Sequence, residues 1–524
     1  MNVADSERMA ALLSEKGMTE AAVVEDADVI VINGCSVREK AVHKAVSSLG
    51  GMRTLKQTRP DGRKGAVIGL GGCVGQLDQG QLFKRAPYLD FVFGTDTIDN
   101  LPEIVDRVQK GERHKVYADF DKSMDYSTET KVHTHKAQAF VNIMKGCDKY
   151  CTYCIVPFTR GREKSRLIDE VVFDVARLIA SGVREITLLG QNVNSFGKGN
   201  ANTKLREPQE LHNVIGKVGP RAGEENFPQL LRAIDNDPRC ALLKRIRFTS
   251  SHPLDFSDEL IDCYAPPSKN GEKGGVARLT SHLHLPVQSG SNRILQKMGR
   301  HHQIENYFAQ MDHLRELNPD VGISTDIIVG FPTETEEDFQ ETLRLLDRVQ
   351  FDNIYAFAYS PRPGTRAAKL PDDVPDDVKN RRLNEVLNYQ MKIAEARYAS
   401  RIGKVMEIMV EGEAKNQKMA IAGPLQSNAS NGGSLSDGGD ILKNDDVAVV
   451  APFVAPKGAR VWTGKTSCFR VVNFISDSPR SLVGKFLDIK ITGSSGLSLA
   501  GELVHDAGHA EARDKSLAGM ETPQ

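Results

Sequence analysis

Three closely spaced cysteines constrain the fold of this chain more than any other feature of its sequence. Cys147, Cys151 and Cys154 form a CxxxCxxC pattern just after an apolar run, Phe140–Met144, which predicts a β-strand. Three thiolates on one loop can ligate three irons of a 4Fe–4S cubane and leave the fourth iron without a protein ligand. Such an open iron can bind the amino and carboxylate groups of S-adenosylmethionine. A zinc site, the alternative, usually takes four ligands, commonly from two CxxC pairs.

The apolar pattern divides the chain into three predicted domains and a tail. Residues 1–126 alternate buried-strand runs with helical stretches, which favours an α/β domain built on a doubly wound parallel sheet. Residues 133–398 repeat the strand and helix patterns about six times, which predicts a complete or partial (βα) barrel with its chemistry at the strand carboxyl ends. Residues 399–506 predict a small β-barrel, and the polar residues 507–524 predict a disordered tail. The predicted barrel strands are Phe140–Met144, Glu185–Leu189, Arg245–Thr249, His282–Pro286, Gly322–Val329 and Asn353–Tyr359.

Composition excludes several classes of protein. The 524 residues carry a net charge of −1, with 40% hydrophobic and 26% charged residues, as soluble multidomain proteins do. Because the global charge is near zero, any RNA contact must come from a local basic face. The sequence has no apolar stretch long enough to span a bilayer, and its start lacks the pattern of a signal peptide. We therefore expect a cytoplasmic monomer without membrane contact.

Two further cysteines lie where a parallel sheet collects its functional groups. Cys35 closely follows the apolar run Asp28–Asn33, and Cys73 closely follows the run Ala66–Leu70. Both fall at the carboxyl ends of predicted strands, which is the edge where ligands bind in open α/β sheets. In a reducing cytosol this pattern favours metal ligation over disulfide formation.

The cysteine loop and its continuation resemble a known family. The segment Cys147–Arg166, which continues after Cys154 as Ile-Val-Pro-Phe-Thr-Arg-Gly-Arg-Glu-Lys-Ser-Arg, resembles the radical-SAM signature of the tRNA methylthiotransferases. It is most similar to the branch that converts N6-isopentenyladenosine to its 2-methylthio derivative, an assignment that depends mainly on Thr159–Glu163 and Ser251–Pro253. The resemblance covers nearly the whole chain through Leu188–Ser195, Phe248–Pro253, His284–Ser291 and Thr325–Pro332.

The resemblance implies two 4Fe–4S clusters and S-adenosylmethionine as cofactors. A 5′-deoxyadenosyl radical formed at the first cluster abstracts hydrogen from the target carbon, and the second cluster carries or donates the sulfur. The two steps require both sites to face one substrate pocket. The implied partners are tRNA, a reductant such as flavodoxin or ferredoxin, and a sulfur donor.

In the family, three N-terminal cysteines hold the second cluster, and Cys35 and Cys73 match two of them. The third belongs to a Cys-Gln-Met-Asn motif just before Asp-Ser-Glu. The sequence begins inside that motif, at Met1–Glu7, so the third ligand is absent from the sequence as given. We expect the codons upstream of Met1 to encode it. The alternatives are a second cluster held by two ligands, or no second cluster.

Five residues near the cysteines or at predicted strand ends are candidate cofactor-binding residues, each with a structural alternative. Tyr153 lies between two of the cysteines, where an aromatic residue of radical-SAM proteins commonly approaches the cofactor's adenine; loop packing is the alternative. Gln191 and Asn192 follow a strand, but they also suit a turn rich in Asn. The resemblance implies cofactor or substrate contact for His284 and Gln288, whereas an isolated His is more often a core residue.

Two basic regions are predicted to contact tRNA. Arg160, Arg162 and Lys164 lie beside the cysteine loop, where they can meet phosphates near the reacting base; a solvated helix start is the alternative. The segment that contains Lys465 and Arg470 resembles part of a TRAM domain, a small RNA-binding barrel. Both side chains are predicted to hold the RNA backbone, and a purely structural barrel is the alternative.

Together these features lead to the expectation of a radical-SAM enzyme that adds a 2-methylthio group to N6-isopentenyladenosine next to the tRNA anticodon. Three alternatives stay open. They are the same chemistry on threonylcarbamoyl-adenosine, methylthiolation of a ribosomal-protein aspartate, and a non-catalytic Fe–S protein that binds RNA. The sequence identifies neither the sulfur source, nor the electron donor, nor the tRNA subset.

Overall fold

The computed structural model describes residues 1–36, 39–57, 64–120, 137–198, 225–267, 274–415, 418–420, 452–454 and 458–504. The chain divides into two compact units, one of Met1–Val349 with Ile354–Leu387 and one of Gln350–Asn353 with Asn388–Gln524. The domain boundaries expected from the sequence stay predictions, and the expected tail at 507–524 lies outside the described residues. Within the described part of the chain, no helix is both long and apolar enough to cross a bilayer.

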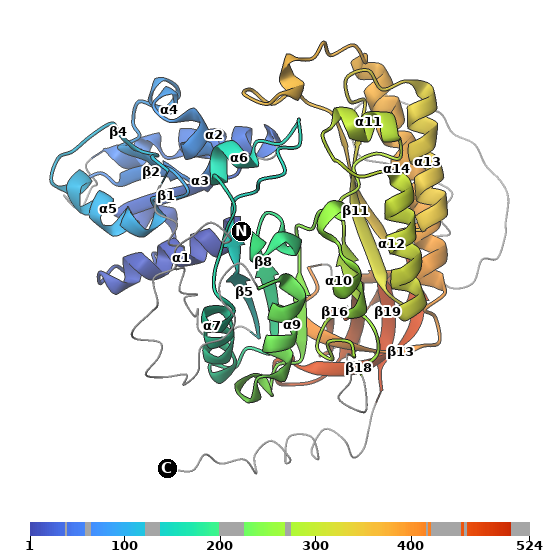
Figure 1. Cartoon of the computed structure of the whole chain (residues 1–524). Helices are drawn as coiled ribbons and strands as arrows, with labels where there is room; N and C mark the ends of the chain where they lie inside the picture. The colour runs from blue at the N-terminus through green and yellow to red at the C-terminus, as the bar shows by residue number, and fades with distance from the viewer. Residues whose placement is uncertain are drawn as a thin grey trace. The chain divides into compact units, whose positions relative to one another are not determined.

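The first unit begins with a four-stranded parallel sheet (Figure 1). Its strands, adjacent in chain order, are β1 (Val29–Gly34), β2 (Val67–Gly71), β3 (Phe91–Phe93) and β4 (Lys115–Tyr117). All residues of β2 are buried. A strand covered on both faces needs no polar side, which explains its uninterrupted apolar sequence.

Helices cover both faces of this sheet. They are α1 (Asn2–Glu15), α2 (Glu39–Gly51), α3 (Gly72–Asp78), α4 (Gln81–Arg85) and α5 (Leu101–Gln109). Residues of α2 and α4 pack on Ile68 and Leu70, whereas residues of α1 and α5 pack on Val67 and Phe93. The predicted α/β domain with a parallel sheet is confirmed.

Two three-stranded sheets follow along the chain. One contains β5 (Gln138–Asn142), β8 (Glu185–Leu189) and β9 (Arg245–Phe248), and the other contains β10 (His282–His284), β11 (Gly322–Val329) and β12 (Asn353–Ala358). A bridge between Ile246 and Leu279 connects the end of the first sheet to the segment before the second. The strands coincide with the six predicted ones, so the predicted partial barrel is confirmed.

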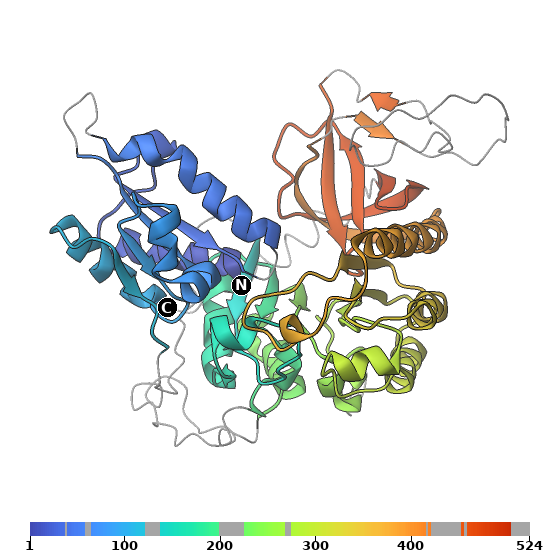
Figure 2. The same cartoon turned by 90° about the horizontal axis from the view of Figure 1, so that it is seen from above.

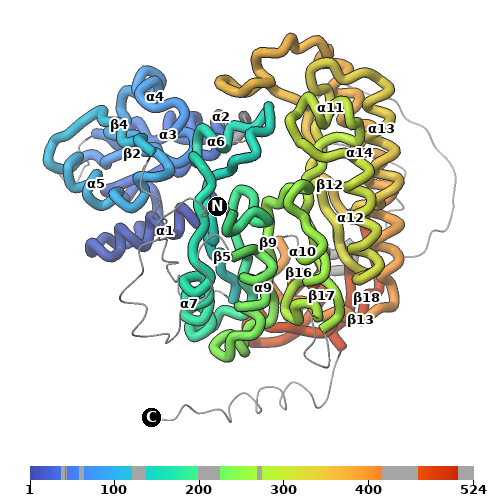
Figure 3. The backbone as a smooth tube through the Cα atoms, in the orientation of Figure 1, coloured from blue at the N-terminus to red at the C-terminus, as the bar shows by residue number. Residues whose placement is uncertain are grey.

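Amphipathic helices accompany these strands. The helices are α7 (Ile168–Ala180), α9 (Phe227–Asn236), α10 (Asp258–Asp262), α11 (Asn292–Lys297), α12 (Ile304–Leu317), α13 (Glu336–Val349) and α14 (Asp376–Ala399). In α7 the buried residues Val171, Val175 and Leu178 recur at helical spacing and form the face that packs inward. Helices α12 and α13 lie side by side along the outside of the second sheet (Figure 3).

The second unit contains a closed β-barrel, drawn in orange and red in Figure 2. Its strands are β13 (Val405–Glu413), β16 (Arg460–Thr466), β17 (Val471–Ser476), β18 (Phe486–Ser494) and β19 (Leu499–Leu503), and a separate pair is formed by β14 (Lys418–Ala420) and β15 (Pro452–Val454). Alternate residues such as Ile408, Val410, Val472 and Phe474 point inward and fill the barrel. The predicted small C-terminal barrel is confirmed.

Candidate active site

The three cysteines of the CxxxCxxC pattern lie on one loop that follows β5. The loop begins after β6 (Met144–Lys145) and leads into helix α6 (Val156–Arg160). The amide of Cys147 donates to the carbonyl of Gly161 over 3.3 Å, and the amide of Thr152 donates to the carbonyl of Met298 over 2.8 Å. The loop is therefore fixed at both ends by backbone bonds to neighbouring segments.

Burial decides the state of the thiols in this loop. Burial, together with a smaller contribution from the neighbouring thiols, raises the pKa of Cys147 and that of Cys154 to about 12. Arg300 supplies a compensating positive charge, because its Nη1 donates to the Sγ of Cys151 over 3.5 Å. Thiols in such a setting lose their protons when a metal replaces them.

This donor set fits an iron–sulfur cubane better than a single metal ion. In the described part of the chain, no group of three His, Cys, Asp or Glu side chains converges on one ion-sized position. A zinc ion requires that convergence. A cubane does not, because each thiolate binds a different iron. Three thiols on one loop are the donors that such a cubane takes, so the residues present fit it.

Buried polar atoms collect in the segments after β8 and β9. Neither amide atom of Asn194 has a hydrogen-bond partner among the described residues, although this side chain is buried. Asn192 donates through Nδ2 to Asp255 over 2.7 Å, but its Oδ1 and the Oγ of Ser251 also have no partner in the described ranges. Such an atom costs about 1–3 kcal/mol. These positions therefore suit the polar groups of a bound ligand.

Gln191 and Tyr153, two predicted cofactor-binding residues, have structural contacts in the first unit. The Oε1 of Gln191 accepts a hydrogen bond of 2.5 Å from the amide of Gly146, directly before the first loop cysteine. Tyr153 packs against an apolar cluster that includes Met298 and Phe331, and burial raises its pKa well above the usual range. The alternative of loop packing thus describes the observed contacts of Tyr153, and Gln191 fastens the loop.

Of the other predicted pair, His284 is the last residue of β10, and Gln288 lies in the segment between β10 and β11. His284 shares a hydrogen bond of 3.0 Å between Nδ1 and the Oγ of Ser324, and its Nε2 lies 3.6 Å from a carboxylate oxygen of Asp326. Burial lowers the pKa of His284, so its imidazole is mostly neutral near pH 7. Gln288 is buried with a positive φ of 80°, and its amide donates to the carbonyl of Asp326 over 2.9 Å.

Two residues beside Cys151 were not predicted from the sequence. The Nε2 of His252 lies 3.9 Å from the Sγ of Cys151, and burial together with the charge of Arg300 lowers the pKa of this histidine strongly. Its position just after β9, at the same edge as Gln191, is the signal that could have found it. Arg300 has no comparable signal, because 149 positions separate it from Cys151.

A buried carboxyl group also lies close to the loop. Burial raises the pKa of Glu163 to about 7, against the opposing effect of its hydrogen bond with Ser195. Its backbone amide donates to Asp148 over 3.3 Å, and its charge raises the pKa of Cys147. Glu163 can therefore hold or release a proton near neutral pH next to the thiols.

Cys35 follows the carboxyl end of β1, and Cys73 lies at the start of α3, just after the carboxyl end of the neighbouring β2. The adjacent residues Gly34 and Gly72 pair across the sheet. Gly72 has a φ of +76°, and a Cβ there would lie 2.2 Å from the Oδ1 of Asn33, so glycine permits this close approach. Burial lowers the pKa of the α-amino group of Met1, whereas the charges of Cys35 and Cys73 raise it, so this group lies near both thiols. Thiolates are the donors that an iron–sulfur cluster takes, so the chemistry of these two side chains suits such a group.

Two of the three residues predicted to contact tRNA beside the cysteine loop are buried. Arg160 and Lys164 are 7% and 6% exposed, respectively. The guanidinium of Arg160 pairs with Asp5 over 2.5 Å, a partner 155 positions away that the sequence pattern did not reveal. Arg162 is the exposed member, and it pairs with Asp148 over 2.7 Å.

The two barrel residues predicted to contact RNA, Lys465 and Arg470, differ in exposure. Arg470 is 1% exposed and pairs with Asp352 and Cys468, so the prediction that it contacts RNA is wrong. Lys465 pairs with Glu411 over 3.0 Å, and its ammonium lies 4.8 Å from the ring centre of the exposed Phe469.

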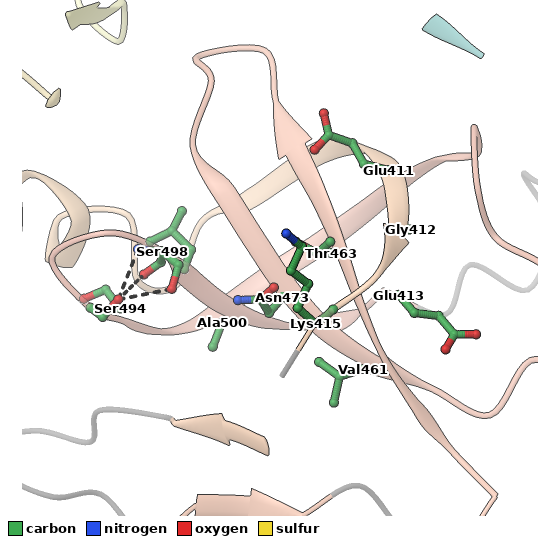
Figure 4. A pocket seen from close by; sticks show the side chains of 13 residues that line it. Glu411, Gly412, Glu413, Lys415, Val461, Thr463, Asn473, Ser494, Ser498 and Ala500 are labelled. Atoms are coloured by element: carbon green, nitrogen blue, oxygen red, sulfur yellow. Dashed lines mark hydrogen bonds between the residues drawn. The ribbon is translucent and has the colours of Figure 1, made fainter. Parts of the chain in front are cut away.

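The barrel also carries a pocket of about 550 Å³ on its surface (Figure 4). Thr463, Asn473 and Ser498 line it together with two carboxylates, those of Glu411 and Glu413. Lys415 lines the pocket as well, and both carboxylates are ion-paired, Glu411 with Lys465 and Glu413 with Arg460. The pocket contains none of the cysteines, and it is not the site of the predicted chemistry.

Two family models match the chain. Residues 1–94 match the uncharacterized protein family UPF0004, and residues 273–346 match the Radical SAM superfamily. A solved radical S-adenosylmethionine methyltransferase, TsrM from Kitasatospora setae, aligns with a TM-score of 0.47 and 14% identity over 69% of this chain and 68% of its own.

Curated relatives share most of their length with this chain. The relative from Paracidovorax citrulli is 39% identical over 96% of this chain and 95% of its own length. The relative from Chromohalobacter salexigens is also 39% identical, over 97% of each chain. One from Bdellovibrio bacteriovorus is 41% identical over 78% of this chain and 82% of its own. All three bear the name tRNA-2-methylthio-N(6)-dimethylallyladenosine synthase. The chain therefore belongs to this family of radical-SAM tRNA methylthiotransferases.

Proposed function

We propose that this chain places a methylthio group on N6-dimethylallyladenosine of tRNA, with Cys147, Cys151 and Cys154 as the ligands of its radical-SAM 4Fe–4S cluster. The observation that carries this proposal is the placement of three thiols on one loop after β5 that backbone bonds fix, with the buried Arg300 beside Cys151. The relatives' shared name favours dimethylallyladenosine over threonylcarbamoyl-adenosine and over a ribosomal-protein aspartate.

When bound, the cluster with S-adenosylmethionine supplies a 5′-deoxyadenosyl radical. The protein's part is to hold the thiolates and balance their charge. Arg300 donates to Cys151 and offsets negative charge that burial would otherwise make costly. The neutral His252 lies 3.9 Å from the same sulfur and adds no second cation. Gln191 fixes the start of the loop through Gly146.

The unpartnered polar atoms after β8 and β9 are the proposed contacts of the cofactor or the substrate nucleoside. Asn192, Asn194 and Ser251 offer buried donors and acceptors in adjacent segments, because the amide of Val193 bonds to the carbonyl of Ser250 over 3.0 Å. His284 and Gln288 are proposed to line the same edge from β10. A ligand that pairs with these atoms removes the cost of leaving them unsatisfied.

The proposed auxiliary 4Fe–4S site lies at Cys35 and Cys73. When bound, this second cluster supplies the sulfur that the product requires. The protein's part is to bring the two thiols together through the paired glycines and to place Arg160 beside Cys73. Its sulfur comes from a separate donor, and electrons come from a reductant such as flavodoxin or ferredoxin.

The proposed tRNA contact beside the loop uses aromatic side chains as well as charge. Tyr150 and Phe158 are 42% and 49% exposed, on the cysteine loop and on α6. With the exposed Arg162 they offer stacking surfaces and one cation, which is the combination that binds unpaired bases. Lys465 and Phe469 are the proposed contacts on the barrel. We further propose that the protein acts as a cytoplasmic monomer.

Anaerobic reconstitution tests this function. The full chain is expected to bind iron and sulfide and to cleave S-adenosylmethionine to 5′-deoxyadenosine, and Cys151→Ala is expected to abolish this cleavage. Cys240→Ala is the matched control, since that thiol is buried elsewhere in the same unit. Mass spectrometry identifies the substrate by comparing tRNA nucleosides from a strain that lacks the gene with those from the same strain after the gene is restored. An unchanged methylthio mark on dimethylallyladenosine in that strain would refute the assignment.

A further inference from the structure

Arg160 connects the cysteine loop to the N-terminal pair of cysteines. It is the last residue of α6, the helix that follows the loop directly. Its Nε donates to the Sγ of Cys73 over 3.3 Å, and its Nη2 donates to the Oδ2 of Asp5 over 2.5 Å. The side chain is almost fully buried, so these bonds form away from solvent.

Two other contacts join the same parts of the first unit. The Nζ of Lys145, just before the loop, lies 3.1 Å from the Oδ1 of Asp96. The Oγ1 of Thr95 donates to the carbonyl of Thr159 over 2.7 Å. The N-terminal domain thus holds the loop on both sides, through Lys145 before it and through Thr159 and Arg160 after it.

The chemistry of arginine explains why this residue type stands there. Arginine presents several N–H donors in a rigid fork, so one guanidinium can bond to a carboxylate and to a sulfur in two directions. A buried cation needs opposite charge nearby. Asp5 supplies one negative charge, and a metal-bound Cys73 thiolate supplies a second. Lysine carries its charge at a single point and lacks this fork, so it cannot reproduce both bonds with the same geometry.

We propose that Arg160 is a positioning residue that couples the two cluster sites: it binds the Cys73 thiolate of the auxiliary site and fixes it relative to the Cys147–Cys154 loop. This inference rests on the proposed function. Hydrogen bonds to ligand sulfurs tune iron–sulfur clusters, and residues that orient ligands affect metal affinity about 10–100-fold. Removal of Arg160 should therefore impair the auxiliary site and leave the loop cluster intact.

The test isolates the auxiliary site by replacing all three loop cysteines with alanine in the full chain. In that background, Arg160→Gln is expected to lower iron and sulfide retention by about 10-fold and to alter the paramagnetic signal of the reduced cluster. Arg160→Lys keeps the positive charge, and it should recover only part of the iron and sulfide retention that Arg160→Gln loses. Arg8→Gln is the matched control, because Arg8 is also an arginine of the N-terminal domain that bonds to an aspartate, in this case Asp99. Thermal unfolding of each variant shows that it is folded.

With the loop cysteines present, Arg160→Gln should still form 5′-deoxyadenosine, while methylthio product per cofactor cleaved falls about 10-fold. Equal behaviour of Arg160→Gln and Arg8→Gln would overturn the proposal. A background variant that retains no iron at all would also overturn it, because Cys73 would then carry no cluster. Failure of the proposed function is a different result: the unmodified chain would not cleave S-adenosylmethionine.

Discussion

The two cysteine sites of this protein are built in opposite ways. Cys147, Cys151 and Cys154 come from one short segment, and their spacing in the sequence already brings them together. Cys35 and Cys73 follow two different strands, and they lie at the same sheet edge because β1 and β2 pair and because Gly34 and Gly72 permit close approach of the backbones there. A side chain from a third segment, Arg160, then reaches Cys73. The first site is specified locally, and the second depends on the tertiary fold.

The largest expected effect comes from breaking the distant site at its backbone. Gly72→Ala places a Cβ 2.2 Å from the Oδ1 of Asn33 at a positive φ, so we expect a loss of roughly 2–4 kcal/mol in unfolding free energy. The variant should lose auxiliary iron while the loop cluster still cleaves S-adenosylmethionine. Gly17→Ala is the control, because its φ is also positive but no atom lies within 4 Å. Equal losses for both variants would show that close packing at Gly72 has no role.

The local site should be most sensitive to its buried cation. Arg300→Met removes the charge beside Cys151 at similar length, and we expect iron affinity at the loop to fall about 10–100-fold. Iron held at Cys35 and Cys73 should not change. Iron analysis of the variant, in chains with and without the auxiliary cysteines, measures both sites. The comparison between the two sites fails if auxiliary iron is lost as well.

A smaller effect is expected from the bond that fastens the loop. Gln191→Ala leaves the amide of Gly146 without its acceptor, which costs about 1–3 kcal/mol. We expect slower and less complete cluster assembly at the loop, followed by absorbance during anaerobic reconstitution. Gln229→Ala removes a side-chain carbonyl from the exposed cap of α9 and serves as the control. If Gln191 instead contacts the cofactor alone, assembly would be normal and only cofactor affinity would fall.

The smallest expected effect concerns RNA contact on the barrel. Lys465→Ala should lower the slope of log affinity against log salt by about one, since one phosphate contact is lost. Arg470→Gln should leave that slope unchanged and instead destabilise the fold, because the side chain is buried against Asp352. Binding of an anticodon stem-loop at several salt concentrations measures both. A change of slope for Arg470→Gln would restore it as an RNA contact.

The difference between local and distant construction also sets what the sequence could predict. The cysteine loop and the barrel strands were found because spacing and apolar runs are local signals. The burial of Arg160 and Arg470 was missed, since their aspartate partners lie 155 and 118 positions away and no local pattern marks them. His252 lies within the motif Phe248–Pro253, which carries part of the family resemblance but no local signal of a cysteine contact. Its contact with Cys151 needs the adjacency of β9 and the loop.

The four residues Gln350–Asn353 belong to the second unit although the chain on both sides of them belongs to the first. Among them, Asp352 accepts from Arg397 over 3.0 and 2.9 Å and from Arg470. A chain ended near residue 387 would keep this carboxylate and lose both arginines that neutralise it. No single cut in the gene therefore yields two intact units. An insertion or fusion just before β12 would displace Asp352 and so disturb its bonds to Arg397 and Arg470 in the second unit.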